Sequence, residues 1–165
     1  MSDAKRFAAI FEGLELAYGT YRIDRKQNNG KNTGKATVVK APRTDEMWEN
    51  HLSGKGDALG IIPINEDTYP LDHTELIQKI RRMKLPLVVC RSKSGGAHCF
   101  LFVDQWVAAK EMQEVLQHVA AALGYGASEI FPKQIKLFLE RGDVGNFLNL
   151  SYYDAEDGLR YAIKD

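Results

Sequence analysis

The stretch Leu85-Pro-Leu-Val-Val-Cys-Arg-Ser-Lys-Ser-Gly-Gly-Ala-His-Cys-Phe-Leu-Phe-Val103 is the part of this chain that says most about its fold. Its two ends, residues 85–90 and 99–103, are short apolar runs. Such runs, bounded by turn residues, are typical of buried β-strands. The sequence therefore predicts two buried strands joined by a polar, glycine-rich loop that ends in one histidine.

This loop carries groups that suit a phosphate. Gly95 and Gly96 let the backbone approach a ligand closely, and successive N–H groups there can form an anion-binding nest. Charge and hydroxyl donors come from Arg91, Ser92, Lys93 and Ser94. We expect a phosphate site beside His98, although the glycine spacing does not match a Walker loop. The alternative is a tight hairpin with solvated basic residues, since a single histidine in a strand is more often part of the core.

Helix and strand patterns surround this hairpin. Asp72, with Glu75 three residues later, resembles a capping box, and Gly124 stands where a helix C-terminal glycine belongs. Helices are expected at residues 7–14, 44–52, 72–83 and 104–123, and strands at 18–23, 36–39, 60–64, 129–131, 147–153 and 159–163. This mixture predicts one α+β domain over residues 1–165, with helices packed on a mostly antiparallel sheet.

The charge of the chain is balanced overall but uneven along its length. Lys and Arg together number 22, as do Asp and Glu, so no global field indicates a polyanionic partner. From Arg22 to Arg43, however, there are seven Lys or Arg residues and one acid, Asp24. Such a surface can follow a phosphate backbone, or it can be a solvated strand face. The DNA-binding candidates in it are Arg22, Arg25, Lys26, Lys31, Lys35 and Lys40.

The remaining composition favours a cytoplasmic setting. Cys90 and Cys99 both lie in apolar runs, where cysteine is commonly a small buried side chain, and two cysteines allow no metal framework alone. No apolar segment of signal length follows Met1, and the apolar runs are too short to cross a bilayer. We therefore expect a cytoplasmic protein without a membrane partner.

Several motifs occur in a characteristic order along the chain. They are residues 11–19 (FEGLELAYG), 51–54 (HLSG), 59–64 (LGIIPI), 69–73 (YPLDH), 91–98 (RSKSGGAH), 129–134 (EIFPKQ) and 145–150 (GNFLNL). Together they resemble the catalytic domain of the archaeo-eukaryotic primase superfamily, in the primase-polymerase branch common in phages and mobile elements. The resemblance covers nearly the whole chain, and it implies an RRM-like catalytic core with a mostly antiparallel sheet flanked by helices.

The resemblance also implies roles for particular residues. The second motif of the family ends in a small residue, any residue and histidine, matched here by Gly96-Ala97-His98, and that histidine contacts the phosphates of the incoming nucleotide. The third motif supplies an acidic strand residue, here Glu129. Lys133 would then reach a triphosphate, and Gln134 the template or sugar.

The first motif departs from the family pattern. The family carries Asp-x-Asp on a strand before the segment matched by Tyr69–His73, whereas here only Asn65-Glu66-Asp67-Thr68 lies between residues 59–64 and that segment. Asp67 takes the second acidic position and Asn65 the first, and Asn is a poor ligand for hard divalent cations. If this segment is a strand, Glu66 points to the other face.

The leading hypothesis is a template-dependent nucleotidyltransferase, a DNA primase or polymerase that uses Mg²⁺ or Mn²⁺. Asp67 and Glu129 would bind metal, with Asn65 or Glu66 assisting, and His98 would complete the catalytic set. Its partners would be nucleoside triphosphates, a single-stranded DNA template and a primer, with a helicase or accessory domain in a longer parent protein. The alternative is a weakened or inactive module that binds nucleotides or single-stranded DNA without turning them over.

Overall fold

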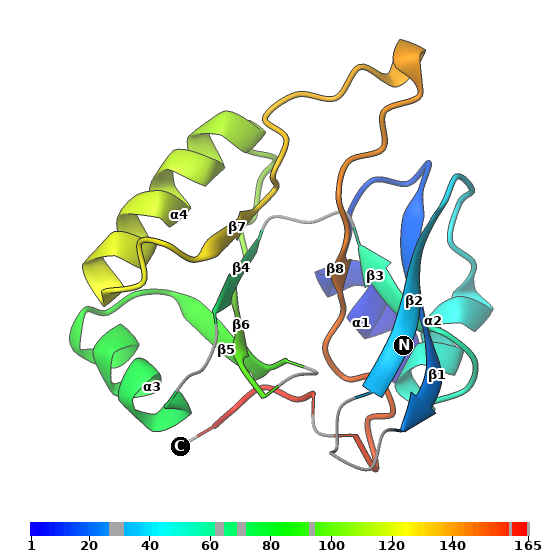
Figure 1. Ribbon diagram of the computed structural model, residues 1–165, viewed down its shortest axis with the longest axis horizontal. Helices are drawn as coiled ribbons and strands as arrows, with labels where there is room; N and C mark the ends of the chain where they lie inside the picture. Colours follow the sequence, from blue (N-terminus) through cyan, green and yellow to red (C-terminus); the bar gives the residue numbers. More distant parts are fainter. Residues whose placement is uncertain (27–31, 62–64, 69–71, 93–94, 159, 165) are drawn as a thin grey trace. The chain divides into compact units, whose positions relative to one another are not determined.

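A computed structural model of the chain describes residues 1–26, 32–61, 65–68, 72–92, 95–158 and 160–164 (Figure 1). For residues 23–26, 32–33, 61 and 65–68 it describes the backbone alone. The chain divides into two compact units, the first formed by Met1–Pro63 and Asn146–Leu159, and the second by Ile64–Gly145 and Arg160–Asp165. Each unit has its own four-stranded antiparallel sheet and its own helices, which confirms the predicted α+β class.

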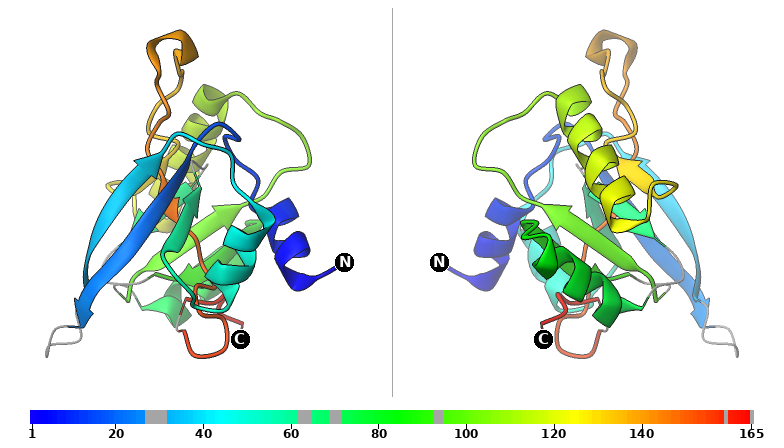
Figure 2. Two further views of the ribbon diagram at one scale, coloured as in Figure 1. Left: turned by 90° about the vertical axis from the view of Figure 1, so that its right-hand side faces the viewer. Right: turned by 90° about the vertical axis from the view of Figure 1, so that its left-hand side faces the viewer.

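The first unit contains two α-helices and a sheet of strand order β2-β1-β3-β8. Its two longest strands, β1 and β2, run side by side as a hairpin (Figure 2). A bulge between Ile23 and Arg25 shifts their register. The strand β3 adds to β1, and β8 returns from much later in the chain to add to β3. The elements are α1 (Asp3–Ile10), β1 (Tyr18–Lys26), β2 (Asn32–Val39), α2 (Asp45–Leu52), β3 (Ala58–Ile61) and β8 (Leu148–Asn149).

A buried histidine ties the elements of the first unit together. His51, at 0% exposure in α2, accepts a hydrogen bond at Nδ1 from the Leu59 N–H over 3.0 Å. Because Nδ1 accepts, the ring proton lies on Nε2, which donates to the Ser151 carbonyl over 2.8 Å. One neutral imidazole therefore satisfies backbone groups of β3 and of the segment after β8, and Phe7 of α1 stacks on it at 5.7 Å.

The second unit has strand order β5-β6-β4-β7. Helix α3 begins after Asp72, whose side chain accepts from the Thr74 and Glu75 N–H groups, so the predicted cap is confirmed. Gly124 ends α4 with φ of 88°, a left-handed conformation that glycine adopts at no steric cost. The elements are β4 (Asn65–Thr68), α3 (His73–Arg82), β5 (Leu87–Arg91), β6 (Ala97–Leu101), α4 (Ala109–Leu123), β7 (Glu129–Phe131) and the 3-10 turn η1 (Leu139–Arg141).

Helices α3 and α4 cover one face of this second sheet (Figures 1 and 2). The core between them is made of alternate strand positions and of apolar helix positions, as the predicted hairpin of buried strands requires. Its main members are Leu76, Ile77, Ile80, Val89, Ala97, Cys99 and Leu123. Because side chains alternate along a strand, Cys90 and His98 belong to the opposite face of the sheet.

Three predicted elements are shorter than the sequence pattern suggested. Helix α4 begins at Ala109 rather than near residue 104. Its buried residues start at Met112, and the positions one and two turns earlier on the same face are Ala108 and Gln105, which offer no large apolar side chain to bury. The strand expected at 147–153 is confined to β8, since Tyr152 has φ of 61° and cannot continue an extended strand. The strand expected at 159–163 is reduced to a single bridge between Cys90 and Ala162.

None of the helices that the structure describes could cross a membrane. The longest of them, α4, has 15 residues. A transmembrane helix needs about 20 predominantly apolar residues.

Candidate functional site

Three residues predicted to be catalytic occupy one row of the second sheet. Asp67 of β4 lies directly opposite His98 of β6 and directly opposite Glu129 of β7. Residues directly opposite each other in antiparallel strands share a face, and their Cβ atoms are about 5 Å apart. The register therefore brings together His98, Asp67 and Glu129, which are far apart in the sequence.

This row lies on the face of the sheet that α3 and α4 do not cover. Its neighbouring row contains Val89 and Cys99, which pack against the helices. His98 is 6% exposed, and its ring lies edge-on to Phe100 at 6.1 Å. The Glu129 side chain is half exposed, so the row runs from a buried imidazole to a solvated carboxylate.

The acidic segment 65–68 forms a short strand of its own, β4, in the centre of the sheet. Asn65 shares the face of Asp67, whereas Glu66 opposes Cys99 and Ile130 and belongs to the helix-covered face. The uncovered face thus carries two carboxylate residues, Asp67 and Glu129, and one amide.

This donor set fits a hard divalent cation that retains several waters, because such an ion is held by one or two protein carboxylates. Among the side chains that the structure describes, no group of three His, Cys, Asp or Glu could hold a metal ion. The side chain of Asp67 is outside that set. A cation at this place would therefore rest on Asp67 and Glu129.

Lys133 lies at the open end of the row. Its ammonium pairs with the Glu129 carboxylate and sits 5.1 Å from the centre of the Phe131 ring. The side chain of Gln113 in α4 donates to the Pro132 carbonyl over 3.0 Å, which fixes the loop that carries Lys133. Gln134 follows in the same loop and is exposed.

The described residues of the glycine-rich loop between β5 and β6 hydrogen-bond to one another. The Ser92 N–H donates to the Gly96 carbonyl over 2.9 Å, and the Gly95 N–H donates to the Ser92 carbonyl over 3.2 Å. Gly95 has φ of 87°, so the turn needs a glycine there. These two N–H groups are used within the loop, which leaves fewer donors for the predicted nest, and Lys93 and Ser94 lie outside the described residues.

The side chains of His73 and Arg91 lie near this loop, but they are not arranged to share one phosphate site with His98. His73, at the start of α3, bonds through Nε2 to the Gly96 carbonyl over 3.0 Å and so ties the loop to the helix. Arg91 opposes Ala97 in the register, on the helix-covered side of the strand and not on the face of His98. The strand alternation therefore separates Arg91 from the row.

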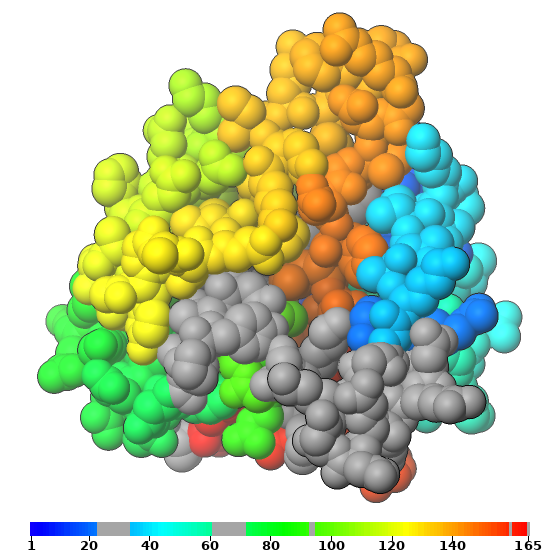
Figure 3. Space-filling model, in the orientation of Figure 1, coloured from blue at the N-terminus to red at the C-terminus, as the bar shows by residue number. Residues whose placement is uncertain are grey.

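The predicted DNA-binding residues belong to the first unit. Arg22 and Lys35 lie directly opposite each other on β1 and β2, and the residues of β2 lie at the surface, in light blue in Figure 3. Arg25 and Lys26 are in the last part of β1, and Lys40 follows β2. Lys31 lies outside the described residues.

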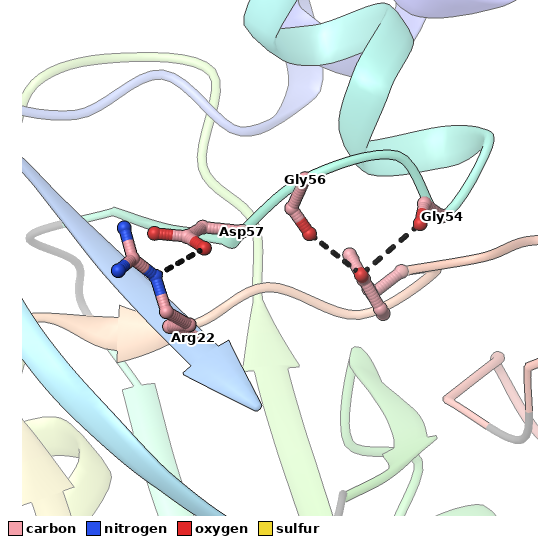
Figure 4. A network of polar contacts seen from close by, with 5 residues as sticks. Arg22, Gly54, Gly56 and Asp57 are labelled. Atoms are coloured by element: carbon pink, nitrogen blue, oxygen red, sulfur yellow. Dashed lines mark hydrogen bonds and ion pairs between the residues drawn. The ribbon is translucent and has the colours of Figure 1, made fainter. Parts of the chain in front are cut away.

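Arg22 and Lys35 line a groove of about 340 Å³ on this sheet. Asp57, just before β3, accepts from Nε of Arg22 over 3.3 Å (Figure 4). Gly54 and Gly56 lie in the same loop as Asp57 (Figure 4). Their carbonyls accept from the hydroxyl of Tyr153, over 3.2 Å at Gly54 and 2.8 Å at Gly56. The groove is lined by Thr20, Arg22, Lys35, Thr37, Val39 and Asp57.

Comparison of the chain with protein-family models and with curated proteins finds no match. What the chain does must therefore be inferred from the two sites themselves.

Sequence reasoning missed several residues of these sites. Thr20 and Thr37 share the groove with Arg22 and Lys35. The alternation Thr-x-Arg in the predicted strand 18–23 was a signal for Thr20, whereas Lys35 lies just before the predicted strand 36–39 that contains Thr37. Asp57 reaches the groove from the loop before β3, 35 residues from Arg22 in the chain, so no local pattern could have indicated it.

Proposed function

We propose that this chain is a template-dependent nucleotidyltransferase, a primase or polymerase that acts with Mg²⁺ or Mn²⁺. The observation that supports this most is the row in which Asp67 opposes both His98 and Glu129. Two acidic residues and a histidine in one row of the strand register, with Lys133 at one end, match the needs of phosphoryl transfer for anionic metal ligands and for cations near phosphate. The primase-like motifs of the sequence point to the same reaction.

In this proposal, the 3′-hydroxyl oxygen of a primer bonds to the α-phosphorus of a nucleoside triphosphate. The bond to the pyrophosphate oxygen breaks, and the hydroxyl proton passes to solvent. Asp67 and Glu129 would hold the divalent cations, and bound cations would neutralise charge that develops on the phosphate oxygens. His98 donates a hydrogen bond to a phosphate. Lys133 separates from Glu129 and then neutralises the leaving pyrophosphate.

A second candidate is a module that binds nucleotide or single-stranded DNA without catalysis. Asn65 stands on the same face as Asp67, where a second acidic residue would strengthen metal binding, and Glu66 belongs to the other face. Lys133 already neutralises Glu129. Both features weaken a site for two metal ions, which is the specific reason to test this alternative.

Primer extension tests the two candidates directly. The full chain is given a labelled primer on a single-stranded template, nucleotides and either Mg²⁺ or Mn²⁺. We expect extension by the native chain and a loss of at least about a hundredfold in Glu129→Gln and Asp67→Asn. Glu140→Gln, an exposed acid in η1, is the matched control and should extend at the native rate.

The outcomes separate the candidates. Absence of extension with both metals, while nucleotide still binds, would contradict the polymerase proposal and favour the binding module. Extension that persists in Glu129→Gln would show that another acid acts as the ligand. We also expect no synthesis on an unprimed template by this chain alone, and gel analysis of labelled dinucleotides checks this.

A further inference from the structure

The groove of the first unit pairs like charges. Arg22 lies directly opposite Lys35, and in the next row of the same face Thr20 lies opposite Thr37. Like charges directly opposite each other on antiparallel strands destabilise the pair. Asp57 relieves this only on one side, through its contact with Nε of Arg22 at 3.3 Å. A bound anion would relieve this repulsion, because the strand register holds both cations next to it.

The groove also has donors that the rest of the described chain does not use. Within the described residues, no acceptor pairs with the ammonium of Lys35 or with the terminal nitrogens of Arg22. In Figure 4 the dashed line to Asp57 starts from Nε of Arg22 and not from a terminal nitrogen. The threonine hydroxyls add two smaller donors beside them. A guanidinium, an ammonium and hydroxyls are the groups that commonly bind phosphate oxygens.

The net charge of the groove suits a bound phosphate group. Arg22 and Lys35 are two cations and Asp57 is one anion, so the groove carries one net positive charge. A phosphodiester carries one negative charge, which equals the net positive charge of the groove, so binding one such group leaves the groove neutral. The volume of about 340 Å³ is near the small end of ligand pockets and suits one nucleotide unit.

We infer that this groove binds a phosphodiester group of a single-stranded nucleic acid, with Asp57 as the group that limits its charge. The inference deepens the proposed function, because it specifies where on the first unit the template strand is held. It concerns binding alone, so its test needs neither metal nor catalysis.

The test is the affinity of the full chain for a short labelled oligothymidylate, measured by fluorescence anisotropy at several salt concentrations with EDTA and without nucleotide. In Lys35→Gln we expect affinity to fall about tenfold at low salt. The slope of log affinity against log salt should be smaller by about 0.7, as for the loss of one phosphate contact on a single strand. Thr37→Val, which keeps the branched shape, should lose about threefold.

Two variants make the test specific. Lys5→Gln removes an exposed lysine of α1 in the same unit and should leave the affinity unchanged. Asp57→Asn raises the net charge of the groove and releases Arg22, so the affinity should rise about threefold with a steeper salt dependence. A purely structural ion pair between Arg22 and Asp57 would give no such gain.

Several results would overturn the inference. They are no measurable oligothymidylate binding, equal affinities in the native chain and Lys35→Gln, or no gain in Asp57→Asn. A parallel titration with a nucleoside triphosphate distinguishes the source of the phosphate, because a loss of triphosphate affinity in Lys35→Gln would assign the groove to free nucleotides instead. If primer extension fails while these binding changes are observed, the groove assignment stands and the catalytic proposal does not.

Discussion

Glu129 and Lys133, four residues apart at the end of β7, form an ion pair beside the row of Asp67 and His98. The pair joins the residue proposed as metal ligand to the residue proposed to bind triphosphate. One ammonium cannot neutralise the carboxylate and a pyrophosphate at the same time. A triphosphate that draws Lys133 away would therefore make Glu129 available to a cation, and the two ligands would bind cooperatively.

This relationship predicts that Lys133→Met binds Mn²⁺ more tightly than the native chain when nucleotide is absent. Both side chains are partly exposed, and exposed ion pairs are worth at most about 1 kcal/mol, so the gain should be roughly twofold to fivefold. Lys133→Arg keeps the charge and should resemble the native chain. Electron paramagnetic resonance of free Mn²⁺ measures the effect, and weaker Mn²⁺ binding in Lys133→Met would refute it.

The buried imidazole of His51 should be a main determinant of the stability of the first unit. His51→Ala leaves the Leu59 N–H and the Ser151 carbonyl unsatisfied in the core, and we expect a loss of about 4 kcal/mol. Urea unfolding followed by the fluorescence of Trp48, which is buried in the same unit, measures it. His118→Ala on the exposed side of α4 is the control, and equal losses in the two variants would contradict this role.

Gly19 is required because an aromatic ring occupies the place of a side chain. A Cβ atom at Gly19 would overlap the ring of Phe147, to which its three nearest atoms all belong. We expect Gly19→Ala to cost about 3 kcal/mol. The double variant with Phe147→Ala should lose less than the sum of the two single variants, as a double-mutant cycle by urea unfolding can show.

Gly126→Ala is the matched control for this cycle. A Cβ there would meet Ala121 at 3.5 Å, an ordinary contact, so its stability should change by no more than about 0.5 kcal/mol. If the losses in free energy of unfolding of the Gly19 and Phe147 variants add up in the double variant, the Phe147 ring is not the reason that position 19 needs glycine.

Arg43 should be sensitive to replacement by lysine. Its Nη1 donates to the Leu14 carbonyl over 3.0 Å, and its guanidinium lies 5.5 Å from the Trp48 ring centre. Burial lowers the pKa of Arg43, while Glu15 and Glu12 oppose this through their charges. Arg43→Lys should cost about 1 kcal/mol in urea unfolding because lysine lacks the planar fork. Lys55→Arg, at an exposed position, should cost nothing measurable.

The elements of the fold were predictable where the local pattern was strong. The cap at Asp72, the glycine end of α4 and the hairpin of β5 and β6 follow from neighbouring residues, and the structure confirms them. The start of α4 and the end of β8 were misjudged, because the buried stripe of the helix and the left-handed Tyr152 depend on what these segments pack against. The site residues 67, 98 and 129 were chosen from motifs, and their roles remain predictions.

The sequence by itself determined the α+β class, most helices and strands, and the residue types from which a phosphate-handling site could be made, because these depend on periodicity and local capping. Only the tertiary structure decided that Asp67 opposes His98 and Glu129, that Arg91 belongs to the other face, and that Asp57 reaches Arg22. The physical reason is strand register. A shift of one residue moves every side chain to the opposite face, and the register is fixed by packing and by hydrogen bonds between segments distant in the chain.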